Sequence, residues 1–323
     1  MYIFIYIYMS NKNIVIFDDK DDKDEEYKKY KKKCLVEQIE GYVLFQNEII
    51  KLYHEKNPKK KNECSDYYAV IVEPRSDHIL LEAVCRNITY FLPDNWNLIV
   101  YSHNERMVNE RLTFIDFEFY KTHKDSYSPE EYSKLLMSVD FWNSIPGENI
   151  LIFQTDSFIT KRFTYSYIES IKQYPFIGAV YRCVIGNSNE DLLCFDKNKN
   201  ISMSGGFSFR KKSAMIDCIK RISIQDIINY IVNKKLRIIY PNVNYEDFYF
   251  QSALYMLNYN FPNYNQCTEF CLQEIYNLSD SHAIHGINRN YVYSKLIFHL
   301  KPPLSEIHDE IMEKCKLLNV INL

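Results

Sequence analysis

An acidic residue at the end of a buried strand is the first place in this sequence where chemistry could occur. Residues 150–157 read ILIFQTDS, an apolar run that ends abruptly in Gln-Thr-Asp-Ser. Ligands of open α/β sheets bind beyond the carboxyl ends of the strands. Asp156 therefore stands where a carboxylate can hold a hard divalent cation, and such a cation would neutralise phosphate oxygens. The alternative is that Asp156 and Ser157 merely cap the segment that follows.

A pair of glycines is the second candidate. Gly205 and Gly206 lie within SMSGGFSFR, residues 202–210, and form the one Gly-Gly pair in a chain with 7 glycines. Glycine permits a positive φ or a close approach between the backbone and a ligand. The pair therefore indicates either a β-bulge or the wall of a binding site, and we favour the binding site.

Two adjacent acidic residues form the third candidate. Glu246 and Asp247 follow a polar loop in NVNYEDFYF, residues 242–250, where a helix is expected to begin. Acidic side chains in a first helical turn often do no more than stabilise the helix dipole. The functional alternative is that one of them is a general base, which must lie within hydrogen-bond reach of the proton that it removes.

Two histidines complete the set. His282 and His285 lie in SHAIHG and follow Cys267 and Cys271, which gives the spacing C-x3-C-x10-H-x2-H. Zinc fingers prefer a longer gap before the histidines and three to five residues between them. We therefore interpret the two cysteines as core thiols. The chain holds 9 cysteines, an odd number that does not suit a disulfide scaffold.

The elements that position these residues alternate between strand and helix. Apolar runs predict buried strands, and apolar residues at helical spacing predict helices. Ser128, Pro129 and Glu131 form a helix start with a capping box, in a helix that runs towards Trp142. The alternation predicts an α/β fold with a mostly parallel central sheet flanked by helices. Strands are expected at 67–72, 97–101, 114–119 (at an edge), 149–153, 176–180 and 203–209, and further helices at 34–53, 76–92, 212–222, 246–257 and 306–318.

Composition excludes several classes of protein. The chain has 39 Lys and Arg against 42 Asp and Glu, a net charge of −3, which argues against nucleic acid as the main partner. Its 7 glycines form neither a G-x-G-x-x-G motif nor a P-loop. The apolar start, MYIFIYIYM, is shorter than the roughly 20 residues of a membrane span and lacks the features of a signal peptide. We therefore expect a cytoplasmic protein without a membrane span.

Taken in order, the motifs resemble a small family of uncharacterised domains in the GT-A glycosyltransferase superfamily. The similarity extends over about residues 67–290 and follows a consistent order along the chain. The similar segments are YAVIVEPR, DNWNLIVYSHNE, ILIFQTDS, PFIGAVYR, SMSGGFSFRKKSAM, NYEDFYFQSAL and HAIHG. The resemblance implies a GT-A-like, Rossmann-related sheet. The abundance of Tyr, Phe, Ile, Asn and Lys is typical of an AT-rich genome, which fits a member from a giant virus, located in the host cytoplasm or a viral factory.

The resemblance also implies roles for individual residues. Asp156 and His285 would bind Mn²⁺ or Mg²⁺ at a degenerate D-x-D element in which Gln154 replaces the first Asp. Asp247 would be the catalytic base, with Glu246 as the alternate. Binding of the nucleotide-sugar donor and the acceptor would fall to Val72, Glu73, Pro74, Arg75, Thr155, Asp156, Ser157, Gly205, Gly206 and Phe207, of which the glycines and Phe207 would lie on the acceptor side.

These expectations define a function and its alternatives. The implied activity is metal-dependent transfer of a sugar from a nucleotide-sugar to a hydroxyl of a glycan or protein acceptor, with inversion if Asp247 is the base. The first alternative is a catalytically inactive GT-A-like module that binds a glycan or a protein. A nucleotidyltransferase ranks lower, because EPRSDH after the first strand offers no glycine-rich phosphate loop. The expected organisation is an N-terminal extension with a charged linker at 1–66, a catalytic domain at 67–300 and a C-terminal helix at 301–323.

Overall fold

A computed structural model describes nearly three fifths of the chain. It covers residues 58–180 apart from Ile79 and Phe114, then residues 203–233, 244–272 and 281–286, and the single positions Ile50 and His54. The expected helix at 306–318, nearly all of that at 34–53, and the charged segment at 18–33 lie outside the described residues.

The strands that the model describes form one sheet in the order β3-β2-β1-β4-β7-β6-β8-β9-β5. Strands β3, β2, β1 and β4 pair in parallel, and so do β6, β8 and β9. Strand β7 is antiparallel to both β4 and β6 and joins the two parallel sets. The strands are β1 Tyr67–Val72, β2 Trp96–Ser102, β3 Phe117–Lys121, β4 Asn149–Phe153, β5 Ser157–Ile159, β6 Phe176–Val180, β7 Met203–Lys211, β8 Cys271–Leu272 and β9 Ala283–His285.

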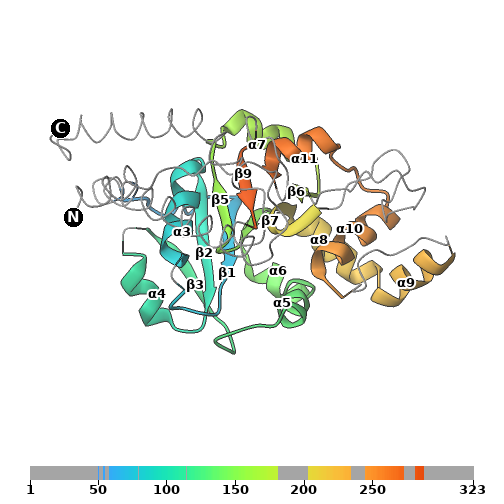
Figure 1. Ribbon diagram of the computed structural model, residues 1–323, viewed down its shortest axis with the longest axis horizontal. Coiled ribbons are helices and arrows are strands. Elements are labelled where there is room, and N and C mark those ends of the chain that lie inside the picture. Colours follow the sequence, from blue (N-terminus) through green and yellow to red (C-terminus); the bar gives the residue numbers. More distant parts are fainter. Residues whose placement is uncertain are drawn as a thin grey trace, which may run out of the picture.

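Helices surround this sheet (Figure 1). Helices α3 and α4 lie beside β1 to β3, α7 and α11 lie at one end of the view, and α8 to α10 lie at the opposite side from α4 (Figure 1). The predicted α/β fold with a mostly parallel, Rossmann-like sheet is confirmed. The helices are α3 Leu81–Phe91, α4 Glu105–Arg111, α5 Pro129–Leu136, α6 Val139–Ser144, α7 Tyr165–Ile171, α8 Lys212–Arg221, α9 Ile224–Asn233, α10 Glu246–Met256 and α11 Tyr264–Phe270.

The central strands form because their apolar runs are buried on both faces. All residues of β2 and β4 are buried, as are all but the first of β1. Such continuous apolar runs are typical of a parallel sheet covered on both sides. Strand β3 lies at the edge, as expected, although it begins at Phe117 rather than at Phe114.

Two helix boundaries differ from the prediction for local reasons. The helix expected from Ser76 begins at Leu81, because Ser76 is held in a turn where its Oγ accepts from the amide of Asn104 at 2.8 Å. The single helix expected from Ser128 towards Trp142 is two helices. The capping box at Ser128 is present, but Ser138 caps a second helix by accepting from the amide of Phe141 at 3.2 Å.

The segment before β1 is tied to the domain. Lys59 Nζ donates to the carbonyl oxygens of Thr89 and Pro93 at 3.0 and 3.1 Å. Thr89 lies in the last turn of helix α3, and Pro93 follows the helix. Lys59 also pairs with Ile115 in an isolated parallel bridge. Residues 58–66, which we assigned to the N-terminal extension, therefore pack against the catalytic domain that the sequence predicts.

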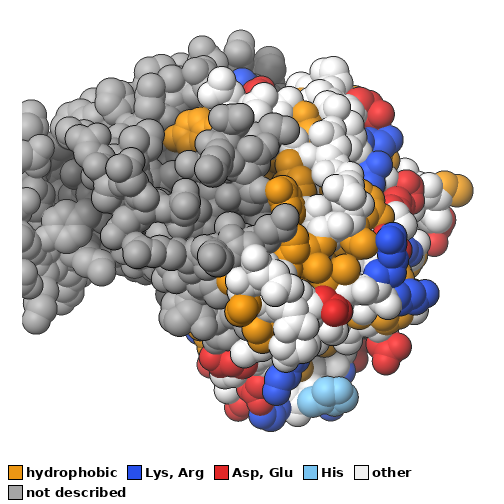
Figure 2. Space-filling model, turned by 90° about the vertical axis from the view of Figure 1, so that its right-hand side faces the viewer, with side chains coloured by type: hydrophobic (Ala, Val, Ile, Leu, Met, Phe, Trp, Pro, Cys, Tyr) orange, Lys and Arg blue, Asp and Glu red, His pale blue; other side chains and the backbone are white. Residues whose placement is uncertain are grey.

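Two further expectations concern membrane spans and the state of the cysteines. Figure 2 shows hydrophobic side chains gathered on the face that carries α9 and α10, where Val232 is 67% exposed. Among the described helices, none is both long enough and apolar enough to cross a membrane. The described cysteines are free thiols, and they are buried except for Cys64.

Asn87 holds the last strand of the sheet in place. This buried side chain of α3 donates to the carbonyl oxygen of Ile159 at 3.1 Å and accepts from its amide at 2.7 Å. It thereby satisfies the outer edge of β5, whose other edge pairs with β9. Strands β5 and β9 frame the candidate site, so the site depends on this contact.

We predict that Asn87→Ala lowers the free energy of unfolding by about 2–4 kcal/mol. The substitution leaves a buried amide and carbonyl without their partner, and each such loss costs about 1–3 kcal/mol. Urea unfolding measures the change, with Asn109→Ala on the exposed face of α4 as the control, expected to stay within about 0.5 kcal/mol. Equal stability of the two variants would show that Asn87 does not hold β5.

Candidate functional site

The turn after β4 brings the predicted metal-binding carboxylate out of the core. The amide of Ser157 donates to the carbonyl oxygen of Gln154 at 3.0 Å, and Ser157 Oγ accepts from the amide of Gln154 at 3.2 Å. Ser157 Oγ also donates to the carbonyl oxygen of Gly206 at 3.1 Å. Strand β5 follows rather than a helix, so Ser157 closes a tight turn and the side chain of Asp156 is left for another contact.

His285 supplies that contact from the far end of the described chain. Strand β9 pairs with β5 so that His285 lies opposite Ser157. Its Nε2 lies 3.3 Å from Asp156 Oδ1 and 3.3 Å from Gln154 Oε1, while Nδ1 lies 3.3 Å from Ser204 Oγ. The amide of Gly286, with a φ of 79°, donates to the carbonyl oxygen of Asp156 at 3.0 Å. The two predicted metal ligands therefore lie together.

His282 and the two cysteines do not join this site. The ring of His282 stacks on Tyr167 with centroids 3.8 Å apart, and burial lowers its pKa to about 4. Cys267 Sγ lies 3.6 Å from the sulfur of Met203, and Cys271 is fully buried. Each of these side chains has a place in the core, as expected for the cysteines.

The atoms around His285 Nε2 have the chemistry of a cation site. A carboxylate oxygen and an amide oxygen face the same ring nitrogen, so three atoms that can donate lone pairs converge. Either a proton on Nε2 or a bound cation satisfies this arrangement. Carboxylate, amide and imidazole donors suit Mn²⁺, and the oxygens also suit Mg²⁺. Within the described ranges, no three side chains of His, Cys, Asp and Glu are grouped so that they could hold a metal ion. In the described part of the chain, Gln154 Oε1 is a further oxygen beside this pair.

The glycine pair forms a bulge in β7. The pairing with β6 passes from Ser208 to Ser204 between two adjacent residues, Gly178 and Ala179. A Cβ on Gly206 would overlap the ring of His285 and lie 2.6 Å from Gln154 Oε1. A Cβ on Gly205 would overlap the Glu246 carboxylate. The bulge that we ranked second is present, and the groups that press on it are side chains of the candidate site.

Glu246 and Asp247 have different surroundings on α10. The Glu246 carboxylate is buried in a bidentate ion pair with Arg210, at 2.6 Å from Nη1 and 3.1 Å from Nη2. Asp247 accepts from the amide of Phe248 at 2.8 Å and more weakly from that of Gly205 at 3.4 Å. Burial and, next, the charge of Glu246 raise the pKa of Asp247 to about 6. A carboxylate with a pKa near neutrality is suited to general base catalysis.

The predicted nucleotide-binding segment ends β1 beside the same turn. Buried Glu73 holds the half-exposed guanidinium of Arg75 through two bonds of 2.7 Å. Thr155 Oγ1 donates to Glu73 Oε2 at 3.4 Å and links the ends of β1 and β4. A hollow of about 380 Å³ adjoins this point at the ends of β1 and β2. It is lined by Pro74, Arg75, Ser76, Asp77, His103, Asn104, Met107, Asp125 and Ser126.

One predicted site residue lies elsewhere. Phe207 is fully buried, and its ring packs against Phe163 and Phe270, with centroids 6.4 and 5.4 Å away. Its side chain therefore belongs to the core rather than to an acceptor surface. Val72 is also buried, so that of the segment after β1 mainly Arg75 is presented to solvent.

Sequence reasoning missed three residues of the site. Arg210 ends the quoted SMSGGFSFR segment, and a cation at the end of an aromatic strand was a signal that it has a buried partner. Tyr132 of α5 lies near Glu246, since that carboxylate, after burial, raises the pKa of the phenol. His78 lies near Glu73, and burial lowers its pKa. Neither Tyr132 nor His78 stands in a pattern that distinguishes it.

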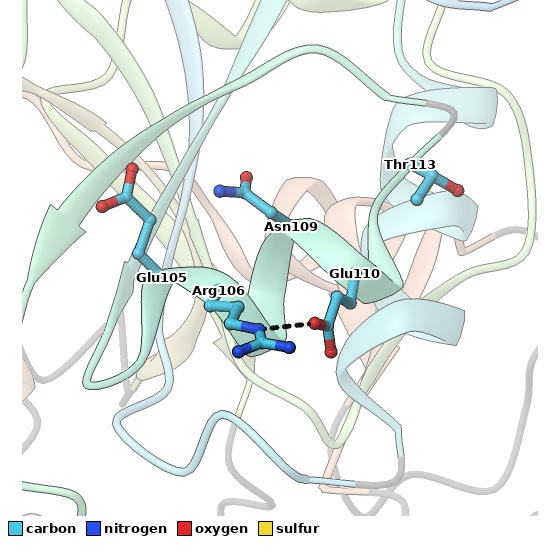
Figure 3. A pocket seen from close by; sticks show the side chains of 5 residues that line it. All are labelled: Glu105, Arg106, Asn109, Glu110 and Thr113. Atoms are coloured by element: carbon cyan, nitrogen blue, oxygen red, sulfur yellow. Dashed lines mark hydrogen bonds and ion pairs between the residues drawn. The ribbon is translucent and has the colours of Figure 1, made fainter.

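Another hollow is separate from this site. It has a volume of about 530 Å³ and lies on the outer side of α4 (Figure 3), lined by Glu105, Arg106, Asn109, Glu110 and Thr113. Arg106 Nε donates to Glu110 at 2.8 Å across it (Figure 3). It is shallow, and two of its charged side chains, Arg106 and Glu110, pair with each other.

Comparison with known proteins places the chain in a family. A search of curated proteins found no match. A family model with the description "Protein of unknown function (DUF5672)" matches residues 114–285, which is more than half of the sequence. The matched region begins before β3 and ends at His285, so it includes Asp156, the glycine bulge and Asp247. The chain belongs to this family of unknown function, DUF5672.

Proposed function

We propose that this protein is a metal-dependent glycosyltransferase that uses a nucleotide-sugar donor and a hydroxyl acceptor. The observation that carries the proposal is the approach of His285 Nε2 to Asp156 Oδ1, at 3.3 Å. The two residues come from distant parts of the chain, and the resemblance to GT-A enzymes assigned the metal to this pair. Asp156 and His285 would hold the ion, with Gln154 Oε1 beside them.

The surroundings of the pair fit a nucleotide diphosphate. A divalent cation bound there would offset the negative charge that develops on a diphosphate leaving group. Arg75 is half-exposed and borders the 380 Å³ hollow at the ends of β1 and β2, where open α/β sheets bind ligands. We assign this hollow to the nucleoside part of the donor.

Asp247 would act on the acceptor. Its carboxylate would remove the proton of the acceptor hydroxyl as that oxygen forms a bond to the anomeric carbon and the bond to the diphosphate breaks. A single displacement of this kind inverts the anomeric configuration. Glu246 is less suited to the role because Arg210 occupies both of its oxygens.

A catalytically inactive module that binds a glycan or a protein is the second candidate. It is favoured by Gln154, which stands where an acidic ligand would strengthen the metal site, and by the lack of a third acidic, Cys or His ligand in the described part of the chain. Calorimetric titration with nucleotide-sugars and Mn²⁺ separates the two candidates, because an inactive module of this kind would show no metal-dependent binding.

A hydrolysis screen tests the proposed activity. We expect the full-length protein to hydrolyse at least one of a panel of nucleotide-sugars slowly when Mn²⁺ is present, because many glycosyltransferases transfer the sugar to water when no acceptor is bound. Released nucleoside diphosphate is the readout, and EDTA should abolish it. Absence of release and of Mn²⁺-dependent binding across the panel would overturn the proposal.

The charge of two neighbouring side chains should set metal affinity. We predict that Asp156→Asn weakens Mn²⁺ binding at least about tenfold, because even the loss of a group that only orients a metal ligand costs about 10–100-fold in affinity. Gln154→Glu keeps the shape of the side chain, adds a carboxylate beside His285 and should tighten binding. Isothermal titration of Mn²⁺ measures both, with Asp140→Asn, at an exposed position of α6, as the control. If all three variants bind like the wild type, the metal lies elsewhere.

The pH dependence of the reaction should report Asp247. A general base works as the carboxylate, so activity should be lost as Asp247 becomes protonated at low pH. With a pKa of about 6, kcat/KM should fall about tenfold per unit below pH 6 and level off above it. Asp247→Asn should abolish turnover at every pH and leave Mn²⁺-dependent nucleotide binding intact. If that variant instead kept activity, and this activity still fell below pH 6, another group would be the one that titrates.

A further inference from the structure

Arg210 is a fully buried cation that contacts the glycine bulge of β7 and the start of α10. Its side chain is enclosed by the rings of Phe176, Phe250 and Trp142, with the guanidinium carbon 4.7, 5.6 and 5.9 Å from the ring centroids. A buried charge is costly unless it is paired and hydrogen-bonded. Glu246 supplies the opposite charge.

The remaining donors of Arg210 hold the backbone of the bulge. Nη2 donates to the carbonyl oxygen of Gly205 at 3.1 Å, and Nε donates to Ser208 Oγ at 2.8 Å. Ser208 Oγ in turn donates to the same Gly205 carbonyl oxygen at 2.8 Å. Arg210 therefore sets the orientation of the Gly205–Gly206 peptide group from two directions, once directly and once through Ser208.

The other side of this bulge faces Asp247. The amide of Gly205 points at Asp247 Oδ2, 3.4 Å away, while the carboxylate of Glu246 lies against the Gly205 α-carbon. The adjacent acids of α10 thus divide their work. Glu246 neutralises Arg210, which holds the carbonyl of Gly205, and Asp247 meets the amide of the same residue.

We propose that Arg210 and Glu246 are positioning residues, whose buried ion pair fixes the backbone of Gly205 at its carbonyl, so that the amide of this residue orients the Asp247 carboxylate. The proposal rests on the proposed function for the catalytic role of Asp247, but the geometry can be tested without any activity. If the ion pair were purely structural, replacing it by apolar groups would leave the contact between the Gly205 amide and the Asp247 carboxylate unchanged.

Among the described residues, two charged side chains act on Asp247. Glu246 on α10 and Arg210 on β7 act on Asp247 with opposite signs, and the Glu246 effect is the larger. Tyr132 on α5 faces Glu246 and Arg210. Cys218 on α8 and Asp226 on α9 also lie near α10, where they raise the pKa of Tyr249 after burial. Removing the Glu246 charge should therefore move the titration of Asp247 to lower pH.

Scarcity of glycine makes this titration observable. The full-length chain labelled with ¹⁵N-glycine gives 7 backbone amide signals, one for each glycine. The Gly205 amide points at Asp247 Oδ2, so its chemical shift should follow the ionisation of that carboxylate, with a midpoint near pH 6. Asp247→Asn identifies the signal, because it removes the pH dependence of that glycine alone.

Two variants then test the ion pair. Glu246→Gln should move the Gly205 midpoint to lower pH. The double variant Arg210→Met, Glu246→Leu replaces the pair by apolar groups, an exchange that buried ion pairs often tolerate, and should strongly reduce the pH-dependent shift of Gly205 while the protein stays folded. Glu110→Gln, which breaks the exposed pair with Arg106 on α4, is the matched control and should change neither quantity.

The outcomes separate this proposal from the proposed function. The proposal would be overturned if the Gly205 signal of the folded double variant titrated as in the wild type. It would also be overturned if no glycine signal differed in its pH dependence between the wild type and Asp247→Asn. This second comparison does not depend on whether the double variant folds. If the shifts change as expected but no nucleotide-sugar is hydrolysed, the positioning geometry stands and the glycosyltransferase proposal fails. With turnover present, Glu246→Gln should lower kcat more than tenfold and leave KM for the donor nearly unchanged.

Discussion

The candidate site is organised by a place where the backbone of β7 has no room for a side chain. A Cβ on Gly206 would overlap His285, and one on Gly205 would overlap Glu246. Two sets of polar groups therefore approach the same two residues from different elements. Asp156, Gln154 and His285 gather beside Gly206, while Arg210, Glu246 and Asp247 gather beside Gly205. The bulge sets the spacing between the proposed cation site and the carboxylate proposed as the base.

The site lies where the parallel pairing of the sheet is interrupted by antiparallel strand β7. Strand β7 runs antiparallel between β4 and β6, so its bulge lies next to the turn that ends β4. Strands β5 and β9 then close the far edge and bring His285 back to Asp156. Without that last pairing, a residue 131 positions after Gln154 would not reach it. The short strands at this edge have little hydrophobic area of their own, and the contact from Asn87 completes their hydrogen bonding.

Local patterns predicted most of the central elements but not their long-range pairing. The apolar runs of β1, β2 and β4, the capping box at Ser128 and the acidic start of α10 are visible in short stretches of sequence. The three-residue strands β5 and β9 are not, because so short a segment has no periodicity and is stabilised by its neighbours. Asp156, His285 and Asp247 were selected from the sequence and lie in one region. The ion pair of Arg210 with Glu246 was missed, since only the fold brings a strand end to a helix start.

The metal is the central claim, and spectroscopy of bound Mn²⁺ tests it most directly. Electron spin-echo envelope modulation of the full-length protein with Mn²⁺ and a nucleoside diphosphate reports nitrogen atoms that coordinate the ion. We predict nitrogen modulation from one imidazole, lost in His285→Gln and retained in His282→Gln. Bound Mn²⁺ without nitrogen modulation, or modulation that survives in His285→Gln, would contradict a metal site built on Asp156 and His285.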